Sequence, residues 1–402
     1  MKVDRAGSSQ CPVSDVDPFS DGFLADPFPS LAELREAGPV VLLRTYGAYA
    51  VAGHEQVQAV VRDPATFSSA AGVGLADARA AGYWRRPSLL VEADPPLHDR
   101  TRSAVAGAVS LRTLRSMRST FEREAEVLAD RLAERGRFDA VPELAEVFAI
   151  EVFANAFGLR EHGRRHLLAY GSMVFNGHGP RNHLFEEAMR DARETVAWVT
   201  EQCSREALRP GSLGAEVYRA ADRGDVTEDE AALLVRSFLS AGVDTTVSSL
   251  SHAVLEFARF PDQWDRLRQD PSLAHDAFEE VVRLDSPVLG FFRTTTAPVS
   301  IGGIPLDAGV KVLVFFAGAN RDPRRWQDPD RFDITRRTVG HMGFGTGVHN
   351  CVGATIARME GEVLLQALAR RIAAWHLAGE VRPRLNNTLR AIASLPVEIT
   401  RS

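Results

Sequence analysis

A glycine-rich loop around a single cysteine constrains this chain more than any other stretch. Residues 343–353 read GFGTGVHNCVG, with four glycines in eleven positions, and residues 354–376 after them are predicted to form a long helix. Glycine has no Cβ, so such a loop can turn tightly and lie flat against a large rigid ligand. N–H groups at the start of the following helix would point at the sulfur of Cys351. The pattern predicts a cradle for a thiolate.

Other interpretations of Cys351 compete with this one. A lone cysteine is most often a small buried hydrophobe. A zinc site is excluded, because the other two cysteines, Cys11 and Cys203, lie far away in the sequence. A Cys–His nucleophile would use His349, two residues away, but a glycine loop beside Phe344 gives that base no rigid support.

The order Phe-Gly-x-Gly-x-His-x-Cys-x-Gly resembles the haem-ligand loop of the cytochrome P450 monooxygenases. Thiolate ligation of haem is typical of this class. The resemblance implies that Cys351 binds the iron of haem b and that His349 reaches a haem propionate. It also implies that Phe344 packs beside the sulfur, with Gly345 and Gly353 in the same cofactor-binding loop.

Length and composition predict one large domain over residues 22–402, after a flexible, polar N-terminus over residues 1–21. The resemblance implies that this domain is the haem domain. The chain is 45% hydrophobic and 25% charged, without repeats or Gly/Ser linkers. Its start lacks the apolar core of a signal peptide, and no apolar run is long enough to span a membrane. The net charge of −6 argues against nucleic acid as a partner. We expect a cytoplasmic protein without a membrane partner.

The order of predicted elements is mainly α with small β-sheets, an α+β class. Residues 40–43 and 48–52 are predicted to form a hairpin, and residues 54–284 are mainly helical. Strand patterns follow at residues 299–301, 310–315 and 396–400. This order fits the P450 fold, a triangular helical body with haem between a long central helix and the cysteine-loop helix.

Residues 227–260 carry the longest helical pattern. Thr227 and Glu230 form a capping box, and no proline occurs before Pro261, so one helix of roughly 50 Å is predicted. Its middle, residues 241–246, reads AGVDTT. Glycine costs about 1 kcal/mol inside a helix, and threonine and aspartate prefer helix ends. Such a local conflict indicates either a functional site or a packing notch between crossing helices.

The AGVDTT run resembles the oxygen-activating motif of the family. The resemblance implies that Ala241 and Gly242 leave room for dioxygen, the co-substrate. It implies that Thr245 hydrogen-bonds the bound oxygen and that Asp244 helps to relay protons. The presence of both residues favours a monooxygenase that uses dioxygen over a peroxide-driven enzyme.

Two charged pairs complete the family pattern. His98 and Arg102 lie four positions apart, and Glu280 and Arg283 lie three apart. Taken alone, each pair is also typical of a solvated helix surface. The resemblance implies that His98, Arg102 and Arg293 bind the haem propionates, and that the Glu-x-x-Arg pair pins the segment before the cysteine loop. The motifs occur in the family's order along nearly the whole chain.

Several other stretches resemble the bacterial subfamily that oxidises para-substituted benzoates and O-demethylates para-methoxybenzoate. They read WRRPS (84–88), FN (175–176), LVRS (234–237), FFRTTT (291–296) and NNTLR (386–390). The resemblance implies a polar end that receives a carboxylate, formed by Arg85, Ser88, Arg236 and Ser237. It implies an apolar slot leading to the iron, lined by Val91, Phe175, Ser240, Ala241, Val288 and Phe291. Both arginines could instead be surface residues.

Helix spacing supports this pocket independently. Ser237, Ala241 and Thr245 recur at four-residue steps on one face, so a group held at Ser237 would place its far end near the oxygen site. His178 departs from the subfamily, which has phenylalanine there. Its imidazole could hydrogen-bond a substituent or carboxylate of the substrate, enlarge the slot, or face water.

The sequence predicts a monooxygenase that hydroxylates or oxidatively O-demethylates a substituted aromatic carboxylic acid. No flavin or nicotinamide domain is evident, so electrons are expected from a ferredoxin and its ferredoxin reductase. An alternative substrate is a larger or phenolic aromatic. An alternative from another class is a haem-binding sensor, which needs no proton relay such as Asp244 and Thr245.

Overall fold

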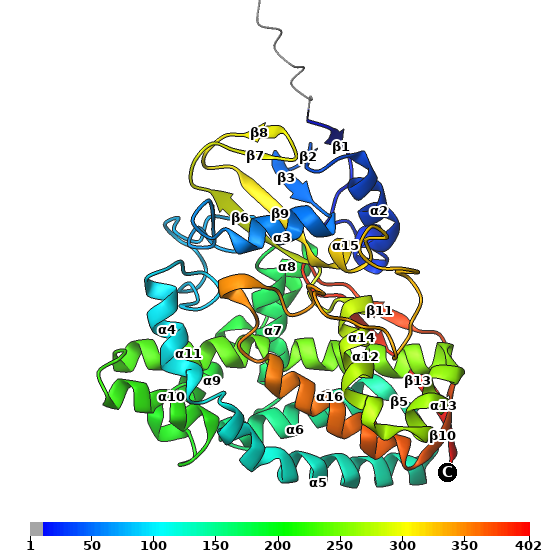
Figure 1. The fold of residues 1–402 in the computed structure, drawn as a ribbon. Helices are drawn as coiled ribbons and strands as arrows, with labels where there is room; N and C mark the ends of the chain where they lie inside the picture. Colours follow the sequence, from blue (N-terminus) through cyan, green and yellow to red (C-terminus); the bar gives the residue numbers. More distant parts are fainter. Residues whose placement is uncertain (1–10) are drawn as a thin grey trace, which may run out of the picture.

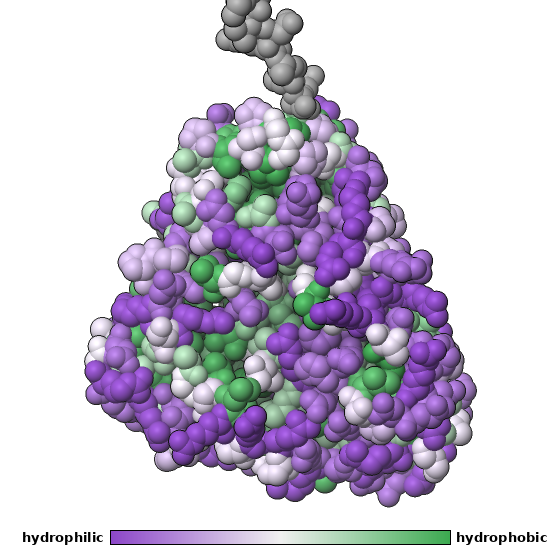
Figure 2. Space-filling view, in the orientation of Figure 1, coloured by the Kyte–Doolittle hydropathy of each residue, from purple (hydrophilic) through white to green (hydrophobic). Residues whose placement is uncertain are grey.

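The largest sheet lies near one corner of a triangular molecule, a three-stranded sheet lies near another, and helices build most of the rest (Figure 1). This computed structural model describes residues 11–402. It confirms the predicted class, mainly α with small β-sheets. Polar side chains cover most of the face in Figure 2, with apolar side chains near its middle and at the corner that holds the largest sheet. Among the described residues, no helix combines the length and apolar character needed to cross a membrane.

The larger sheet joins the two ends of the chain. Its order is β1 (Val13–Ser14), β2 (Val41–Leu43), β3 (Ala48–Val51), β9 (Lys311–Phe315), β6 (Gly290–Thr295) and β4 (Phe67–Ser68). The predicted hairpin is confirmed, because β2 and β3 pair antiparallel with Leu42 opposite Tyr49. Strand β3 then pairs in parallel with β9. Helices α1 (Asp21–Ala25), α2 (Phe28–Ala37) and α3 (His54–Arg62) accompany this sheet.

The N-terminal segment is more ordered than its polar composition indicates. The flexible segment expected over residues 1–21 begins with residues 1–10, which lie outside the described residues. From residue 11 onward the chain packs on the sheet: β1 pairs with β2, and the Tyr46 hydroxyl donates a hydrogen bond to Asp17 over 2.9 Å. Phe19 is buried against Tyr46 and Phe292. One buried aromatic side chain therefore anchors an otherwise polar stretch.

The helical body surrounds the cysteine-loop helix α16, which packs along α5 and against α14. Its helices are α4 (Leu97–Ala106), α5 (Leu111–Arg135), α6 (Glu146–Phe157), α7 (His166–Asn176), α8 (His183–Ala188), α9 (Ala192–Gln202), α10 (Leu213–Asp222), α11 (Glu228–Ala241), α12 (Asp244–Arg259), α13 (Pro261–Gln269), α14 (Ala274–Asp285), α15 (Phe316–Asn320) and α16 (Ala354–Ala369). Small two-stranded sheets pair β7 (Val299–Ile301) with β8 (Ile304–Leu306) and β11 (Arg382–Arg384) with β12 (Ala391–Ser394).

The predicted single helix over residues 227–260 is wrong at its centre. Its capping box is present, but the helix is divided into α11 and α12 at residues 242–243. There the Thr245 hydroxyl donates to the carbonyl of Ala241 over 2.7 Å, and the Thr246 hydroxyl donates to the carbonyl of Gly242 over 3.0 Å. Threonine hydroxyls compete with backbone N–H groups for helix carbonyls. The conflict seen in the sequence therefore produces a real break.

The helix predicted over residues 354–376 is also shorter than expected. It ends at Ala369, and residues 372–377 form β10. This strand pairs antiparallel with β13 (Pro396–Arg401), which in turn pairs with β5 (Arg137–Asp139). Burial of Ile372 and Trp375, together with a ladder of backbone hydrogen bonds to β13, outweighs the local helical pattern.

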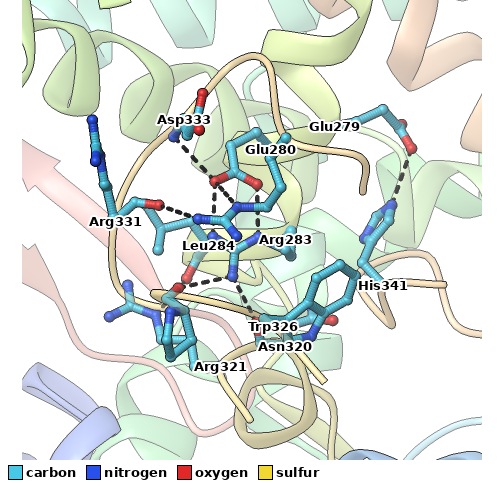
Figure 3. A network of polar contacts seen from close by, with 12 residues as sticks. Glu279, Glu280, Arg283, Leu284, Asn320, Arg321, Trp326, Arg331, Asp333 and His341 are labelled. Carbon is cyan, nitrogen blue, oxygen red and sulfur yellow. Dashed lines mark hydrogen bonds and ion pairs between the residues drawn. The ribbon is translucent and has the colours of Figure 1, made fainter. Parts of the chain in front are cut away.

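A buried ion pair fixes the segment that leads to the cysteine loop (Figure 3). Glu280 and Arg283 on α14 make two parallel contacts of 2.6 and 2.8 Å, and both side chains are fully buried. Arg283 also donates to the carbonyls of Asn320 and Pro329, and Glu280 accepts from the backbone N–H of Asp333. These contacts join α14 to residues 320–333.

We expect Arg283→Ala to lower the free energy of unfolding by about 3–5 kcal/mol, because Glu280 would remain charged and buried without its partner. Urea denaturation followed by far-UV circular dichroism measures this. The matched control is Arg219→Ala, which removes an exposed pair with Glu216 at the same three-residue spacing. That variant should change stability by less than about 1 kcal/mol. Equal effects in both variants would contradict the assignment.

Candidate active site

A cavity of about 260 Å³ lies between α11 and α12 on one side and the cysteine loop with α16 on the other. It brings together nearly all site residues predicted from the sequence. From the cofactor set it is lined by His98, Arg102, Arg293, Phe344, Gly345, His349, Cys351 and Gly353. From the substrate and oxygen sets it is lined by Arg85, Ser88, Val91, Phe175, His178, Arg236, Ser237, Ser240, Ala241, Thr245, Val288 and Phe291.

The cysteine loop turns as its glycines require. Gly345 and Gly347 have φ values of 66° and 72°, a region that favours glycine. The N–H of Cys351 donates to the carbonyl of Phe344 over 2.8 Å, which closes the loop. Burial raises the pKa of the Cys351 thiol, whereas hydrogen bonds from the N–H groups of Gly353 and Ala354 act in the opposite direction. The sulfur thus faces the cavity with backbone donors behind it.

Glu279 holds this loop from the side of α14. Its carboxylate accepts from His341 Nε2 over 3.0 Å and from Arg358 Nε over 2.7 Å (Figure 3 shows the first contact). Arg358 in turn lies over the ring of Phe344, 4.5 Å from its centre. Burial opposes the charge, but these hydrogen bonds prevail and lower the pKa of Glu279 to about 2. One carboxylate therefore links α14, the loop and α16.

Four cationic or titratable side chains line one part of the cavity. Arg293 is buried, and the rings of His98 and His349 lie 4.6 Å apart. Across residues 11–402, neither Arg102 nor Arg293 forms a salt bridge. Burial and the neighbouring positive charges lower the pKa of His349 to about 3, and its buried Nε2 has no hydrogen-bond partner in the described structure. This group of donors fits an anionic ligand with more than one carboxylate.

The helix break places Thr245 at the cavity and Asp244 away from it. Asp244 is buried, does not line the cavity, and pairs with Arg384 over 2.7 Å. Side chains of successive helical residues point about 100° apart, so Asp244 and Thr245 lie in different surroundings. Of the two residues to which the sequence assigned oxygen binding and proton relay, only Thr245 lines the cavity. Gly242 beside them has no room for a Cβ, which would lie 2.2 Å from Phe153, so the predicted packing notch is also present.

A carboxylic acid that does line the cavity was missed by the sequence analysis. Glu360 on α16 lines the cavity, and its Oε2 accepts a hydrogen bond from the Thr246 hydroxyl over 3.2 Å. Its other oxygen has no partner among the described residues, and burial raises the pKa of Glu360 to about 8. The available signal was a glutamate within an apolar helix, nine positions after Cys351.

The opposite end of the cavity is polar. Arg85 and Glu92 form a buried pair with an N–O distance of 2.7 Å, and Glu92 also accepts from the N–H of Ser88. The hydroxyls of Ser88 and Ser237 lie 3.0 Å apart. Arg236 donates only to backbone carbonyls. Two guanidinium groups thus face one carboxylate, which leaves one positive charge without a counter-charge. Arg85, with 8% of its side chain exposed, is not a surface residue.

His178 lies in the aromatic wall of the cavity. Its ring meets those of Phe175 and Phe291 edge-on, with centroid distances of 6.0 and 5.4 Å. Only 5% of the residue is exposed, so the expectation of a loop residue facing water is wrong. Burial lowers the pKa of His178 to about 4, which keeps the imidazole neutral.

Fold and site together define a protein that presents a cysteine sulfur and a cluster of cations to one buried ligand. A family model described as Cytochrome P450 matches residues 179–398. The chain is 51% identical to Cytochrome p450 CYP199A2 of Rhodopseudomonas palustris, over 97% of this chain and 95% of that one. It is 32% identical to 6-deoxyerythronolide B hydroxylase of Saccharopolyspora erythraea, over 94% of this chain and 98% of that one.

Two solved structures are similar over nearly the whole chain. Cytochrome P450 CREJ in complex with (4-ethylphenyl) dihydrogen phosphate has a TM-score of 0.86 and 25% identity, and covers 96% of this chain and 99% of its own. P450BioI in complex with a hexadec-9Z-enoic acid ligated acyl carrier protein has a TM-score of 0.85 and 26% identity, and covers 94% and 100%. The chain belongs to the cytochrome P450 family and is a monooxygenase, an oxidoreductase.

Family membership implies a haem-thiolate centre, and the residues present fit it. The unpaired Nε2 of His349 and the two arginines without salt bridges are suited to a buried dicarboxylate. Gly347 passes so close to Val61 that a Cβ would lie 2.9 Å from its carbonyl oxygen. The loop therefore packs closely on the end of α3 at Gly347.

We expect Cys351→Ala to abolish the thiolate-type absorbance of the reduced, carbon-monoxide-treated protein, because no other cysteine lines the cavity. Absorption spectra of the purified holoprotein measure this. Cys203→Ala, which removes a buried thiol outside the cavity, should leave the spectrum unchanged. A thiolate-type spectrum that survives Cys351→Ala would overturn the ligand assignment.

Glu279→Gln should lower stability at pH 7 by roughly 1–3 kcal/mol, because a charged hydrogen-bonded carboxylate is lost. The folded pKa of Glu279 lies below its unfolded value, so this stabilisation is complete above about pH 4.5 and is lost as the pH falls toward 2. The difference between the urea midpoints of wild type and variant, measured from pH 7 to pH 3, should therefore narrow steadily in acid. A difference that does not depend on pH would contradict this account.

Proposed function

We propose that the enzyme hydroxylates, or oxidatively O-demethylates, a substituted aromatic carboxylic acid. The observation that carries this proposal is the excess positive charge at the polar end of the cavity, across from the oxygen site. A buried carboxylate is stable only when a cation and hydrogen-bond donors compensate its charge. Arg236 offers the charge, and the Ser88 hydroxyl can turn its proton toward a ligand, whereas the Ser237 hydroxyl donates its own proton to the carbonyl of Leu233.

The apolar middle of the cavity supports an aromatic ring as the body of the substrate. Val91, Phe175, Val288 and Phe291 line it between the polar end and the cysteine loop. The same residues lie in or near the stretches that resemble the para-methoxybenzoate subfamily. One structural relative binds (4-ethylphenyl) dihydrogen phosphate, which is also an aromatic ring with an anion and a para substituent.

The cofactor residues follow from the same proposal. Cys351 would ligate the iron of haem b, and His98, Arg102, Arg293 and His349 would hold its propionates. Haem bound to a thiolate supplies the oxidising chemistry, with dioxygen as co-substrate. The chain itself excludes bulk water and holds the substrate in place. Electrons would come from a ferredoxin and its reductase in the cytoplasm.

Proton delivery to the oxygen site would involve Thr245 directly and Asp244 indirectly. The Thr245 hydroxyl donates its own proton to the carbonyl of Ala241, so its lone pairs are free to accept a hydrogen bond from a ligand in the cavity. Asp244 is held by Arg384 and would have to leave that ion pair before it could exchange a proton with the cavity. The relay predicted from the sequence thus requires a conformational step.

We expect para-methoxybenzoate to bind the wild-type holoenzyme at least tenfold more tightly than para-methoxybenzamide, which has the same shape without the charge. Arg236→Met should weaken binding of the acid by about tenfold or more and leave the amide within threefold. Titrations followed by the Soret band measure both. Equal affinity for acid and amide would refute the carboxylate pocket.

Substrate-dependent consumption of reductant, with formaldehyde release from methoxy substrates, would separate the enzyme from a haem-binding sensor.

A further inference from the structure

The wall of the substrate cavity contains a polar side chain that the proposed function leaves without a role. His178 follows α7, and its backbone is fixed on both sides. Its carbonyl accepts a hydrogen bond from the N–H of Leu75 over 2.8 Å, and its own N–H donates to the carbonyl of Phe175. A Cβ on Gly74 would lie 2.7 Å from the Cα of His178, so the two segments are in direct contact. The imidazole therefore cannot leave the wall by a small backbone shift.

Both ring nitrogens of His178 are buried and have no hydrogen-bond partner in the part of the chain that the structure describes. Burying polar atoms without partners is unfavourable, and phenylalanine would fill the same wall without that cost. The void behind the ring measures about 10 Å³ and is lined mainly by apolar side chains. That volume is at the lower limit for a single water molecule. A partner for the imidazole therefore has to come from the main cavity.

The surroundings of His178 define the chemistry of that partner. Burial and the positive charge of Arg85 disfavour protonation, and the negative charge of Glu92 acts in the opposite direction. A neutral imidazole offers one N–H donor and one nitrogen acceptor. An alcohol or phenol hydroxyl can satisfy either nitrogen, whereas a second carboxylate could only accept from the N–H and would be repelled by the negative charge of Glu92 nearby. The observations favour an uncharged hydroxyl.

We propose that His178 binds a hydroxyl group on the ring of the aromatic acid, so that the preferred substrates are hydroxylated alkoxybenzoates. This inference rests on the proposed function, because it needs the carboxylate at the polar end and the ring between Phe175 and Phe291. It makes His178 a residue that determines specificity. The residue neither supplies charge nor takes part in proton delivery at the oxygen site.

The test compares ligands that differ in one group. Holoenzyme is titrated with 4-methoxybenzoate, with its 2-hydroxy and 3-hydroxy derivatives, and with 3-methyl-4-methoxybenzoate. The methyl derivative matches the hydroxyl in size but makes no hydrogen bond, so it separates hydrogen bonding from a merely wider slot. Affinities are measured by the Soret shift and by calorimetry in wild type, His178→Phe and His178→Gln.

We expect at least one hydroxy derivative to lose tenfold or more in affinity in His178→Phe, while 4-methoxybenzoate and the methyl derivative change less than threefold. His178→Gln keeps a donor and an acceptor and should restore part of the hydroxyl preference. The thermal midpoint shows whether His178→Phe folds. If it does not fold, His178→Gln is the variant that tests the role of His178. The same hydroxyl preference in all three proteins would overturn the role of His178.

Failure of the proposed function gives a different result. In that case none of the acids would bind more tightly than its neutral amide in any of the three proteins, and the role of His178 would fall with it. If the acids keep their advantage over the amides but the hydroxyl effect is absent, only the role of His178 is refuted.

Discussion

The ion pair of Glu280 and Arg283 is the constraint on which the cysteine loop depends. The segment between α15 and α16 contains no long helix or strand, so its position has to come from side chains on α14. Arg283 binds carbonyls of that segment, Glu280 binds one of its N–H groups, and Glu279 on the same helix holds His341 and Arg358. One helix thus fixes irregular backbone on both sides of the site. Two adjacent glutamates achieve this because they point to different parts of the segment.

The cavity has unbalanced positive charge at two separated places. The first is the group of Arg102 and Arg293 with two histidines, and the second is the pair of Arg85 and Arg236, which has only Glu92 as a counter-charge. Apolar side chains lie between them. A buried cation without a partner is unfavourable, so such an arrangement is stable when anions occupy both places. This charge distribution supports the proposal of one anionic cofactor and one anionic substrate in the same cavity.

Much of the site was predictable because its residues lie in motifs with characteristic spacing. The cysteine loop, the His98–Arg102 pair and the three residues at four-residue steps on α11 and α12 all reached the same cavity. Glu360 and Arg384 were not found, because each acts through a partner distant in sequence. Glu92 was missed although Arg85 is only seven residues away, because the loop that holds both has no periodicity that would place their side chains together. The break at residues 242–243 was visible as poor helix composition. Its consequence for Asp244 required the three-dimensional position of Arg384.

The Glu92 carboxylate beside Arg85 determines how many negative charges a ligand bound at the polar end of the cavity can carry. It cancels one of two guanidinium charges, and the remaining single charge matches a monoanion. An aromatic dicarboxylate would bring a second negative charge into a region where Glu92 already stands and no further cation is available among the cavity-lining residues there. The same acidic side chain that weakens the attraction for any anion thus discriminates against phthalate-like compounds in favour of simple benzoates.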